Sequence, residues 1–461
     1  MKKNAYILSL EAKIEAQSEQ IRLQAAHIKE LELKVMYLLE LLQKQGIVKH
    51  SQNSSLPPSK DLVKKDPPIK SKSELKNGGQ FGHDGNTLKM SSTPDKIYDL
   101  KSEYCGKCGS KLESNSYTLQ AKRQVIVLPP IQPQYEEYRQ YSCQCNKCGH
   151  SQKADFPSGV NAPIQYGGDI AFLVSYLSVY QHIPYLRLQQ LFSQVFGLPL
   201  SQGSIPNILE RVAKRCDGIY QRIKEEISQS TVVGSDETGA RVNSKNWWIW
   251  TWQNSLNTYI TATDNRSYQS IENQFPKGFD QAILVSDRLP AQLKVKAKGH
   301  QVCLVHLIRD ATFLEESEAL AFSTQFKELF FDIFKLKKQS ISEAKALQID
   351  DPRTIDIENR LNILLALPIN TQQNPNSACF QRSIIKLRNY ITPCLYHLDV
   401  PPDNNGSERA IRNIKVKQKV SGQFKSGQNT FCTLRSVMDT LIKRGLSIFD
   451  TIKLACSIQP E

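Results

Sequence analysis

The sequence predicts a multidomain protein of mixed α+β and α/β class. Three observations support this prediction. An apolar heptad repeat opens the chain, two Cys-x-x-Cys pairs occur near residues 105 and 145, and strand patterns in the order β-β-β-α-β begin at residue 231. At 461 residues the chain is about three domains long. A hydrophobic share of 40% and a charged share of 23% are typical of globular proteins and exclude a disordered or fibrous chain.

The charge balance indicates a polyanionic partner. Lys and Arg number 59 against 45 Asp and Glu, which gives a formal net charge of +14. Such a surplus suits nucleic acid or an acidic membrane surface. No stretch approaches the roughly 18 apolar residues of a spanning helix, and charges from Glu11 onward interrupt a signal-like start. We therefore expect a cytoplasmic protein whose eleven cysteines do not form disulfides, and we interpret the closely spaced cysteine pairs as metal sites.

The heptad repeat covers residues 1–45. Apolar residues recur every seven positions, with leucines three positions further on: Ile7, Ile14, Ile21, Ile28, Val35 and Leu42, then Leu10, Leu31 and Leu38. β-Branched residues at one seam position with Leu at the other favour a parallel two-stranded coil, although Gln17 and Gln24 interrupt it. We expect a homodimer through this coiled coil. The alternative is one amphipathic helix packed on its own domain.

Residues 46–100 are predicted to be a flexible basic linker. Between 43 and 80 there are eight lysines against three acids, and Pro57, Pro58, Pro67 and Pro68 cannot continue a helix. This segment is either a solvated tether or an arm that follows a phosphate backbone.

The cysteine pairs predict a zinc ribbon over residues 101–160. Cys105 with Cys108, and Cys145 with Cys148, have the spacing that shares one tetrahedral Zn²⁺, and a glycine follows each pair. Strand-like sequence lies between them at 124–128 and 135–141. We expect a structural zinc, with Cys143 as the alternative to Cys145 as a ligand.

Residues 165–227 are predicted to form a helical, helix-turn-helix-like domain. Gly197 ends the second helix, and Ser201 or Ser204 can cap the third. This outline is also common in helical bundles that do not bind DNA.

The remainder, 228–461, is predicted to carry a mixed sheet. Strand patterns occur at 231–238, 247–252, 258–263 and 282–287, with a helix before the last. In an RNase H-like sheet the first and fourth strands are neighbours, which would place Asp236 beside Asp287. Paired carboxylates suit Mg²⁺. The alternative is that each Asp only caps the turn after its strand.

A third acid is expected on a later helix. After a helical insertion at about 318–400, Asn405 or Ser407 can cap a helix that presents Glu408 in its first turn. Cations follow this acid directly: Arg409, Arg412, Lys415, Lys417 and Lys419. Glu408 is either a metal ligand beside phosphate-binding cations or a salt-bridge partner.

These motifs together resemble bacterial insertion-sequence transposases of the insertion-sequence-sixty-six class, which are DDE transposases. The resemblance extends over almost the whole chain. It includes the heptads, the Asn-Ser-Ser…Pro-Pro-Ser run at 53–59, the glycine-rich stretch at 78–85, both cysteine pairs, Asp236-Glu237-Thr238, Cys303-Leu304-Val305-His306…Arg309, and Asn405-Gly406-Ser407-Glu408-Arg409…Arg412.

The resemblance implies an RNase H-like catalytic domain whose triad is Asp236, Asp287 and Glu408. It also places His306 and Arg309 near the active site. The sequence departs from the family pattern at Arg288-Leu289-Pro290, which makes Asp287 less secure than Asp236, and Asp310 is a weaker rival.

The implied activity is strand cleavage and strand transfer at the ends of an insertion sequence. Mg²⁺ or Mn²⁺ would be the catalytic cofactor, with water and then a 3′-hydroxyl as nucleophiles. The implied partners are double-stranded DNA, as terminal inverted repeats and target, with helper proteins as further candidates. The expected location is the bacterial nucleoid. The main alternative is a non-catalytic, dimeric zinc-containing DNA-binding regulator, and a third is a nuclease or repair enzyme that cuts without joining.

Overall fold

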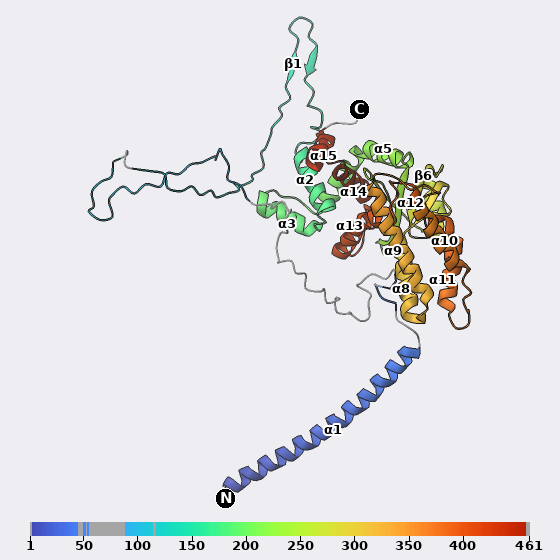
Figure 1. The fold of residues 1–461 in the computed structure, drawn as a ribbon. Coiled ribbons are helices and arrows are strands. Elements are labelled where there is room, and N and C mark those ends of the chain that lie inside the picture. The colour runs from blue at the N-terminus through green and yellow to red at the C-terminus, as the bar shows by residue number, and fades with distance from the viewer. Residues whose placement is uncertain (1, 45–48, 52, 55–87, 114–116, 458–461) are drawn as a thin grey trace. The chain divides into compact units, whose positions relative to one another are not determined.

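The computed structural model describes the whole chain except residues 1, 45–48, 52, 55–87, 114–116 and 458–461 (Figure 1). Most of the predicted basic linker, including the proline pairs and the glycine-rich stretch, therefore lies outside the described residues. The chain divides into two compact units. One unit comprises Val63–Glu137 with Leu191–Pro199, and the other comprises Met1–Leu62, Tyr138–Gln190 and Leu200–Glu461.

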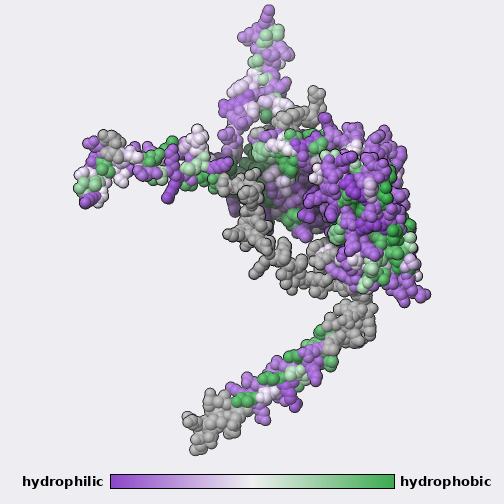
Figure 2. Space-filling view, viewed as in Figure 1, coloured by the Kyte–Doolittle hydropathy of each residue, from purple (hydrophilic) through white to green (hydrophobic). Residues whose placement is uncertain are grey.

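The heptad segment forms one helix, α1, over Lys2–Lys44 (Figure 1). Its seam residues Ile14, Ile21, Ile28 and Val35 are between 54% and 65% exposed. Figure 2 shows hydrophobic patches among hydrophilic surface along the described part of this helix. An exposed apolar seam of this length is suited to a partner helix. Dimer formation through it stays a prediction.

Both cysteine pairs fold into the same tight turn. The backbone N–H of Gly109 donates to Cys105 O at 2.9 Å, and that of Gly149 donates to Cys145 O at 2.8 Å. Both glycines have positive φ, 69° and 72°, which residues with a side chain rarely adopt. Cys145 thus occupies the turn position that corresponds to Cys105, while Cys143 lies on the preceding strand. Zinc binding by the two turns stays a prediction.

Strands β1 (Ser142–Gln144) and β2 (Ser151–Lys153) pair antiparallel around the second turn. The strands expected at 124–128 and 135–141 are not formed, so that part of the prediction was wrong. Val125 to Leu128 are between 75% and 89% exposed. Their high strand propensity has no neighbouring strand to pair with, and propensity without pairing does not make a sheet.

The segment expected to be helical is helical. Gly197 directly follows the helix Tyr185–Phe196 and has a φ of 62°. The Ser201 hydroxyl accepts a hydrogen bond from the Ser204 N–H at 3.0 Å. No helix of the described residues is long and apolar enough to cross a membrane. The elements are α2 (Gly168–Ser175), the π-helix η3 (Tyr176–Tyr180), α3 (Tyr185–Phe196), α4 (Ser204–Arg215) and α5 (Asp217–Ser228).

A five-stranded mixed sheet follows, in the order β5-β4-β3-β6-β7. The first three strands form the expected antiparallel meander, and β3 lies parallel to β6, with Val232 opposite Ile283. The sequence prediction missed the edge strand β7, because half of its residues are polar. The bounds are β3 (Val232–Val242), β4 (Lys245–Gln253), β5 (Thr258–Thr263), α6 (Tyr268–Gln274), β6 (Phe279–Ser286), α7 (Pro290–Leu293) and β7 (Ala297–Val302).

Helices then pack against β6 and β7 around one apolar core that includes Val285, Val302, Phe326 and Leu361. On the meander, Trp250 and Trp252 are fully buried and stacked at 5.8 Å, so they serve core packing rather than base stacking. The helices are α8 (Leu304–Glu318), α9 (Ala321–Ser342), α10 (Pro352–Ala366), α11 (Pro375–Lys386), the 3-10 helix η4 (Arg388–Tyr390) and α12 (Pro393–Tyr396).

The last helices are α13 (Asn405–Ser421), α14 (Gln428–Lys443) and α15 (Ile448–Ser457). The N-terminus of α13 lies so close to the sheet that a Cβ at either of two glycines would displace neighbouring side chains. A Cβ on Gly234 of β3 would come within 2.6 Å of both Ser407 Oγ and Gln253 Nε2, and a Cβ on Gly406 would come within 2.4 Å of the same Gln253 atom. These glycines set the distance between β3 and the helix that carries Glu408.

We expect Gly234→Ala to displace this helix. Overpacking of this kind costs about 1–3 kcal/mol, and the added methyl would also press on the Asn404 side chain at 3.3 Å. Unfolding in urea should show the loss of stability. Gly239→Ala is the matched control on the same strand, because its Cβ would meet only Trp248 at 3.9 Å. Equal stability of the two variants would contradict the close-approach argument.

Candidate active site

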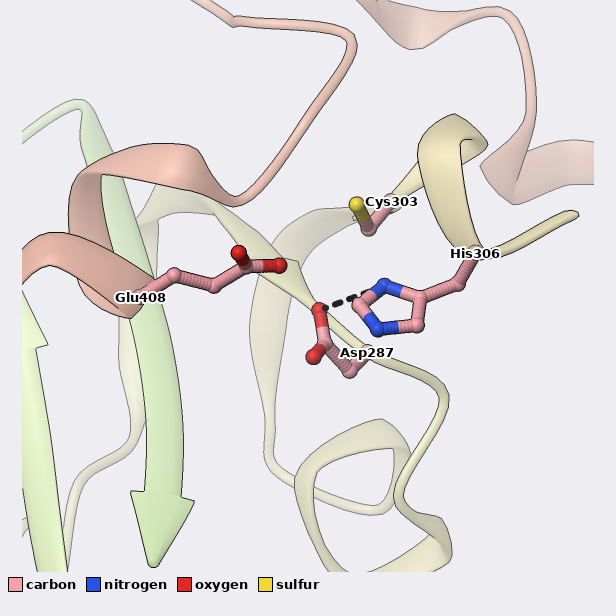
Figure 3. A group of neighbouring side chains, drawn as sticks. All are labelled: Asp287, Cys303, His306 and Glu408. Atoms are coloured by element: carbon pink, nitrogen blue, oxygen red, sulfur yellow. Dashed lines mark ion pairs between the residues drawn. The ribbon is translucent and has the colours of Figure 1, made fainter. Parts of the chain in front are cut away.

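The three predicted carboxylates come from three elements that converge at one edge of the sheet. Asp236 lies on β3, Asp287 directly follows β6, and Glu408 lies in the first turn of α13. Oxygen atoms of Asp287 and Glu408 belong to a group of ligand atoms that all lie within 4.8 Å of one another, together with Cys303 and His306 (Figure 3). Residues more than a hundred positions apart thus meet in one place.

Asp236 is electrostatically coupled to the other acids. Burial raises its pKa well above the ordinary value of 3.8, and the neighbouring carboxylates of Asp287, Glu237 and Glu408 raise it further. Burial also raises the pKa of Asp287, against the opposing effects of the Asn404 hydrogen bond and of nearby arginines. Buried like charges that act on Asp236 in this way are favoured when a cation lies among them.

Asn404 links the elements of the site, and the sequence prediction did not identify it. Its Nδ2 donates to Ser235 O at 2.8 Å and to Asp287 Oδ1 at 3.2 Å, and its backbone N–H donates to Cys303 Sγ at 3.3 Å. The helix cap was expected at Asn405 or Ser407, but the residue at the cap position of α13 is Asn404. Its side chain makes no capping hydrogen bond to the helix. An Asn directly before a helix is a common cap, but its side chain here is used to orient a carboxylate.

We expect Asn404→Ala to weaken metal binding about 10–100-fold, because groups that hydrogen-bond a metal ligand commonly contribute that much. The concentration of Mn²⁺ at half-saturation, measured calorimetrically on the full chain, is the readout. Asn405→Ala is the control, since this neighbouring side chain makes none of these contacts. Unchanged affinity in Asn404→Ala would show that Asp287 is oriented by other means.

Glu237, next to Asp236, is held by partners of its own. Its carboxylate accepts hydrogen bonds from Arg266 Nε at 3.0 Å and from Gln292 Nε2 at 3.0 Å, and the Arg266 guanidinium lies 4.7 Å from the Trp248 ring. Burial raises the pKa of Glu237, and Arg266 opposes that rise. Glu237 therefore fixes β3 against α7 and is not an open ligand position.

The start of α8 supplies nitrogen and sulfur atoms to the site. His306 Nδ1 lies 3.5 Å from Asp287 Oδ1, and its Nε2 lies 3.4 Å from Arg309 Nη1. Burial lowers the pKa of His306, and the Arg309 charge lowers it further, so the imidazole is neutral at pH 7. Burial raises the pKa of the Cys303 thiol to about 12. The sequence prediction placed His306 and Arg309 near the site, and the structure brings both there.

The departure at Arg288-Leu289-Pro290 has a structural explanation. Arg288 adopts a φ of 68°, and Pro290 begins α7 at a position where a helix tolerates proline. The Arg288 side chain forms an ion pair with Asp310 at 2.6 Å. Asp310, the alternative to Asp287 as the second acid of the triad, therefore pairs with Arg288 and is not a member of the ligand group.

The donor set fits a divalent cation. Three carboxylates converge in a partly buried place, and His306 Nδ1 and Asn404 Oδ1 are buried without a hydrogen-bond partner among the described residues. Buried like charges repel unless a cation or protons neutralise them. Asp236, Asp287 and Glu408 would hold the ion through oxygen atoms, the ligands that Mg²⁺ and Mn²⁺ prefer.

Four of the five cations expected to bind DNA are exposed on α13. Arg409, Arg412, Lys415 and Lys419 are accessible. Lys417 is not, so the prediction for this residue was wrong. It is only 9% exposed and its Nζ lies 5.7 Å from the centre of the Tyr185 ring. On a helix, position 417 faces inward together with Ile414 and Ala410, and the run of charged letters concealed this periodicity.

Comparison with known proteins identifies the family of the chain. No curated protein is significantly similar to the chain. Residues 164–430, more than half of the chain, match the sequence profile described as "Transposase IS66 family". The match begins before α2 and ends within α14, so it includes the sheet, the helical insertion and all three carboxylates. The chain therefore belongs to the IS66 family of transposases.

Proposed function

We propose that this protein binds the ends of an insertion sequence and performs metal-dependent strand cleavage and strand transfer at Asp236, Asp287 and Glu408. Membership of the transposase family supports a transposase role. The observation that carries the finer proposal is the convergence of three acids from β3, β6 and α13, where burial, and then the neighbouring carboxylates, raise the pKa of Asp236. A site built for a neutral ligand would not bring three buried acids together.

When bound, Mg²⁺ or Mn²⁺ would polarise the scissile phosphodiester and activate the attacking oxygen. Residues of this chain hold the carboxylates in position. Asn404 holds the Asp287 carboxylate through the 3.2 Å hydrogen bond, and the glycines at 234 and 406 fix Glu408 against β3. Arg309, 3.4 Å from His306, presents a cation beside the site where a phosphate would bind. Fixed groups of this kind stabilise a transition state without reorganising during the reaction.

The exposed cations of α13 would bind the DNA backbone next to the site. Residues 408–444 carry nine basic against two acidic residues, a net of +7, and 43–80 carry eight against three, a net of +5. Together they hold 12 of the 14 surplus charges. One cationic segment precedes in sequence the cysteine turns and the helices α2 to α5, to which we assign recognition of the element ends, and the other directly follows Glu408.

Arg412→Gln and Lys419→Gln should each reduce the salt dependence of DNA binding. Each phosphate contact contributes about 0.9 to the slope of log K against log salt concentration, so loss of one contact lowers the slope by about that amount. Fluorescence anisotropy at several salt concentrations measures it. Lys335→Gln, an exposed cation on α9, is the control. A slope equal to wild type in both α13 variants would place the DNA elsewhere.

The proposal extends to the N-terminal half. The exposed seam of α1 supports pairing of two chains, and the matching turns at Cys105 and Cys145 support structural Zn²⁺. A dimer that carries two catalytic domains could hold two element ends together. Sedimentation of the full chain should give a dimer, and Ile21→Asp should give a monomer, because a charge in the seam opposes pairing.

The test of the function is cleavage of a labelled terminal-repeat duplex by the full chain. A transposase nicks it with Mg²⁺ and then joins the 3′ end to target DNA. A non-catalytic regulator only retards the duplex in a gel, and a nuclease cuts without joining. Cleavage without any joined product, or retardation without cleavage, would overturn the proposal.

A further inference from the structure

We propose that Asp287, Cys303, His306 and Glu408 also form a mixed-ligand site for Zn²⁺, distinct from the oxygen-only set proposed for Mg²⁺. The inference rests on the proposed function in one respect, because two of these carboxylates serve both sets. A thiol, an imidazole and carboxylates are the ligand types of protein zinc sites, and four of them suffice. Mg²⁺, by contrast, prefers six oxygen ligands.

The four side chains are already gathered. Their ligand atoms lie within 4.8 Å of one another, and Figure 3 shows the sulfur, the imidazole and the two carboxylates facing the same small space. Cys303 is fully buried and His306 is 7% exposed. Cys303 and His306 lie at the β7–α8 junction, Asp287 directly follows β6, and Glu408 lies in the first turn of α13. No loop must therefore move to bring the four side chains together.

The His306 ring is directed at this space, where its Nδ1 lies at ion-pair distance from Asp287 (Figure 3). Its Nδ1 is buried with no hydrogen bond to any described residue and lies 3.5 Å from Asp287 Oδ1. Tetrahedral Zn²⁺ with bonds of about 2.0–2.3 Å separates its ligands by roughly 3.3–3.8 Å. That pair is therefore already at the required spacing. The longer side chain of Glu408 can make the remaining adjustment.

Zinc binding has two costs in this site. The Cys303 thiol must release its proton to solvent, as thiols do when they coordinate zinc. The neutral His306 ring must coordinate through Nδ1 and carry its proton on Nε2, so the 3.4 Å contact of Arg309 with Nε2 must be given up. In protein zinc sites the bonds between metal and ligands offset costs of this kind.

Because both ligand sets use Asp287 and Glu408, Zn²⁺ and Mg²⁺ cannot bind to the same chain at the same time. Zn²⁺ in the mixed set would remove two of the three carboxylates from the Mg²⁺ set and leave Asp236 alone. Zn²⁺ should therefore inhibit Mg²⁺-dependent cleavage, and a higher Mg²⁺ concentration should relieve the inhibition. Cys303 and His306 would then act as the residues that make the site sensitive to zinc.

The experiment counts zinc on the full-length protein after equilibration with Zn²⁺ alone and removal of loosely bound ion. Wild type should bind one Zn²⁺ per chain more than Cys303→Ser and more than His306→Asn. The cysteine turns near 105 and 145 are intact in all of these proteins and cancel in the comparison. Cys394→Ser is the matched control, because Cys394 is equally buried but lies in the core beside α9. It should bind as much zinc as wild type.

Co²⁺ provides a second readout, since a thiolate ligand gives it a charge-transfer absorption. That absorption should be weaker in Cys303→Ser by one thiolate and unchanged in Cys394→Ser. If Cys303→Ser fails to fold, the comparison of bound zinc per chain is made between wild type and His306→Asn. Equal zinc in wild type and in the folded ligand variants overturns the inference.

The outcome is separable from that of the proposed function. Mg²⁺-dependent nicking by zinc-free wild type, without an extra bound Zn²⁺, would overturn the zinc site and leave the transposase proposal standing. An extra Zn²⁺ that depends on Cys303 and His306, in a protein that does not nick with Mg²⁺, would support the zinc site and overturn the catalytic proposal.

Discussion

Asp236→Asn and Glu408→Gln should each lower strand cleavage by about 10³-fold, the size of effect seen when one group that stabilises transition-state charge is removed. Binding to the terminal repeats should be unchanged or slightly tighter, because phosphate contacts supply most of the affinity and each variant removes a negative charge. Cleavage of a labelled duplex and gel retardation, measured on the same preparations, separate the two effects.

Asp310→Asn is the discriminating control for this result. Asp310 lies near the site but pairs with Arg288 at 2.6 Å, and such a partly exposed ion pair contributes at most about 1 kcal/mol. Its loss should cost cleavage no more than about fivefold, the rate equivalent of that free energy. If Asp310→Asn abolished cleavage and Asp236→Asn did not, the assignment of the triad would be wrong.

The same Asp236→Asn change should stabilise the protein when no divalent ion is bound. The folded chain raises the pKa of Asp236 above its ordinary value of 3.8, so the folded state holds a proton that the unfolded state releases. Stability is therefore lost as the pH rises from the ordinary value through the raised one. The Asn variant avoids this loss, which we expect to be about 1–3 kcal/mol.

Thermal unfolding in a chelator at pH 5 and pH 8 measures the effect, with about 2–4 °C expected per kcal/mol. The Asn variant should melt higher than wild type, by more at pH 8 than at pH 5. Added Mg²⁺ should narrow the difference, because the cation neutralises the wild-type carboxylates. Asp280→Asn, an exposed acid on β6 paired with Lys296, should behave as wild type. An identical melting temperature for Asp236→Asn and wild type at both pH values would show that the acids do not repel.

Much of the catalytic unit could be predicted from the sequence. Strand patterns in the sequence predicted the meander, and their order, interpreted as an RNase H-like sheet, predicted that β3 and β6 are neighbours, as they are. The resemblance pointed to Glu408 across 120 intervening residues, a separation that no local pattern could bridge. The family match and the mixed sheet agree with the predicted family and fold, and the role of Glu408 stays a prediction.

The residues that were missed or misplaced share a physical reason. Asn404 and Cys303 matter through hydrogen bonds to residues far away in the chain, which no spacing reveals. The predictions for Lys417 and for the strand-like segment at 124–128 were based on residue type alone, whereas the environment of both depends on what packs beside them. A lysine can point inward on a charged helix, and a valine-rich segment remains exposed when no strand pairs with it.

The position of Asn404 so late in the chain has a consequence for shortened copies. A chain that stops before this residue keeps the sequence of the heptad helix and of both cysteine turns. It lacks Glu408 and the hydrogen bonds that orient Asp287, and it also lacks α14 and α15, which pack against α2, α4 and α5. Under the proposed function, such a fragment would still pair with an intact chain through the heptad helix but would not cut DNA. Truncation would then make it an antagonist of the full-length protein, and a gene that decays from its 3′ end would restrain its active relatives in the same cell.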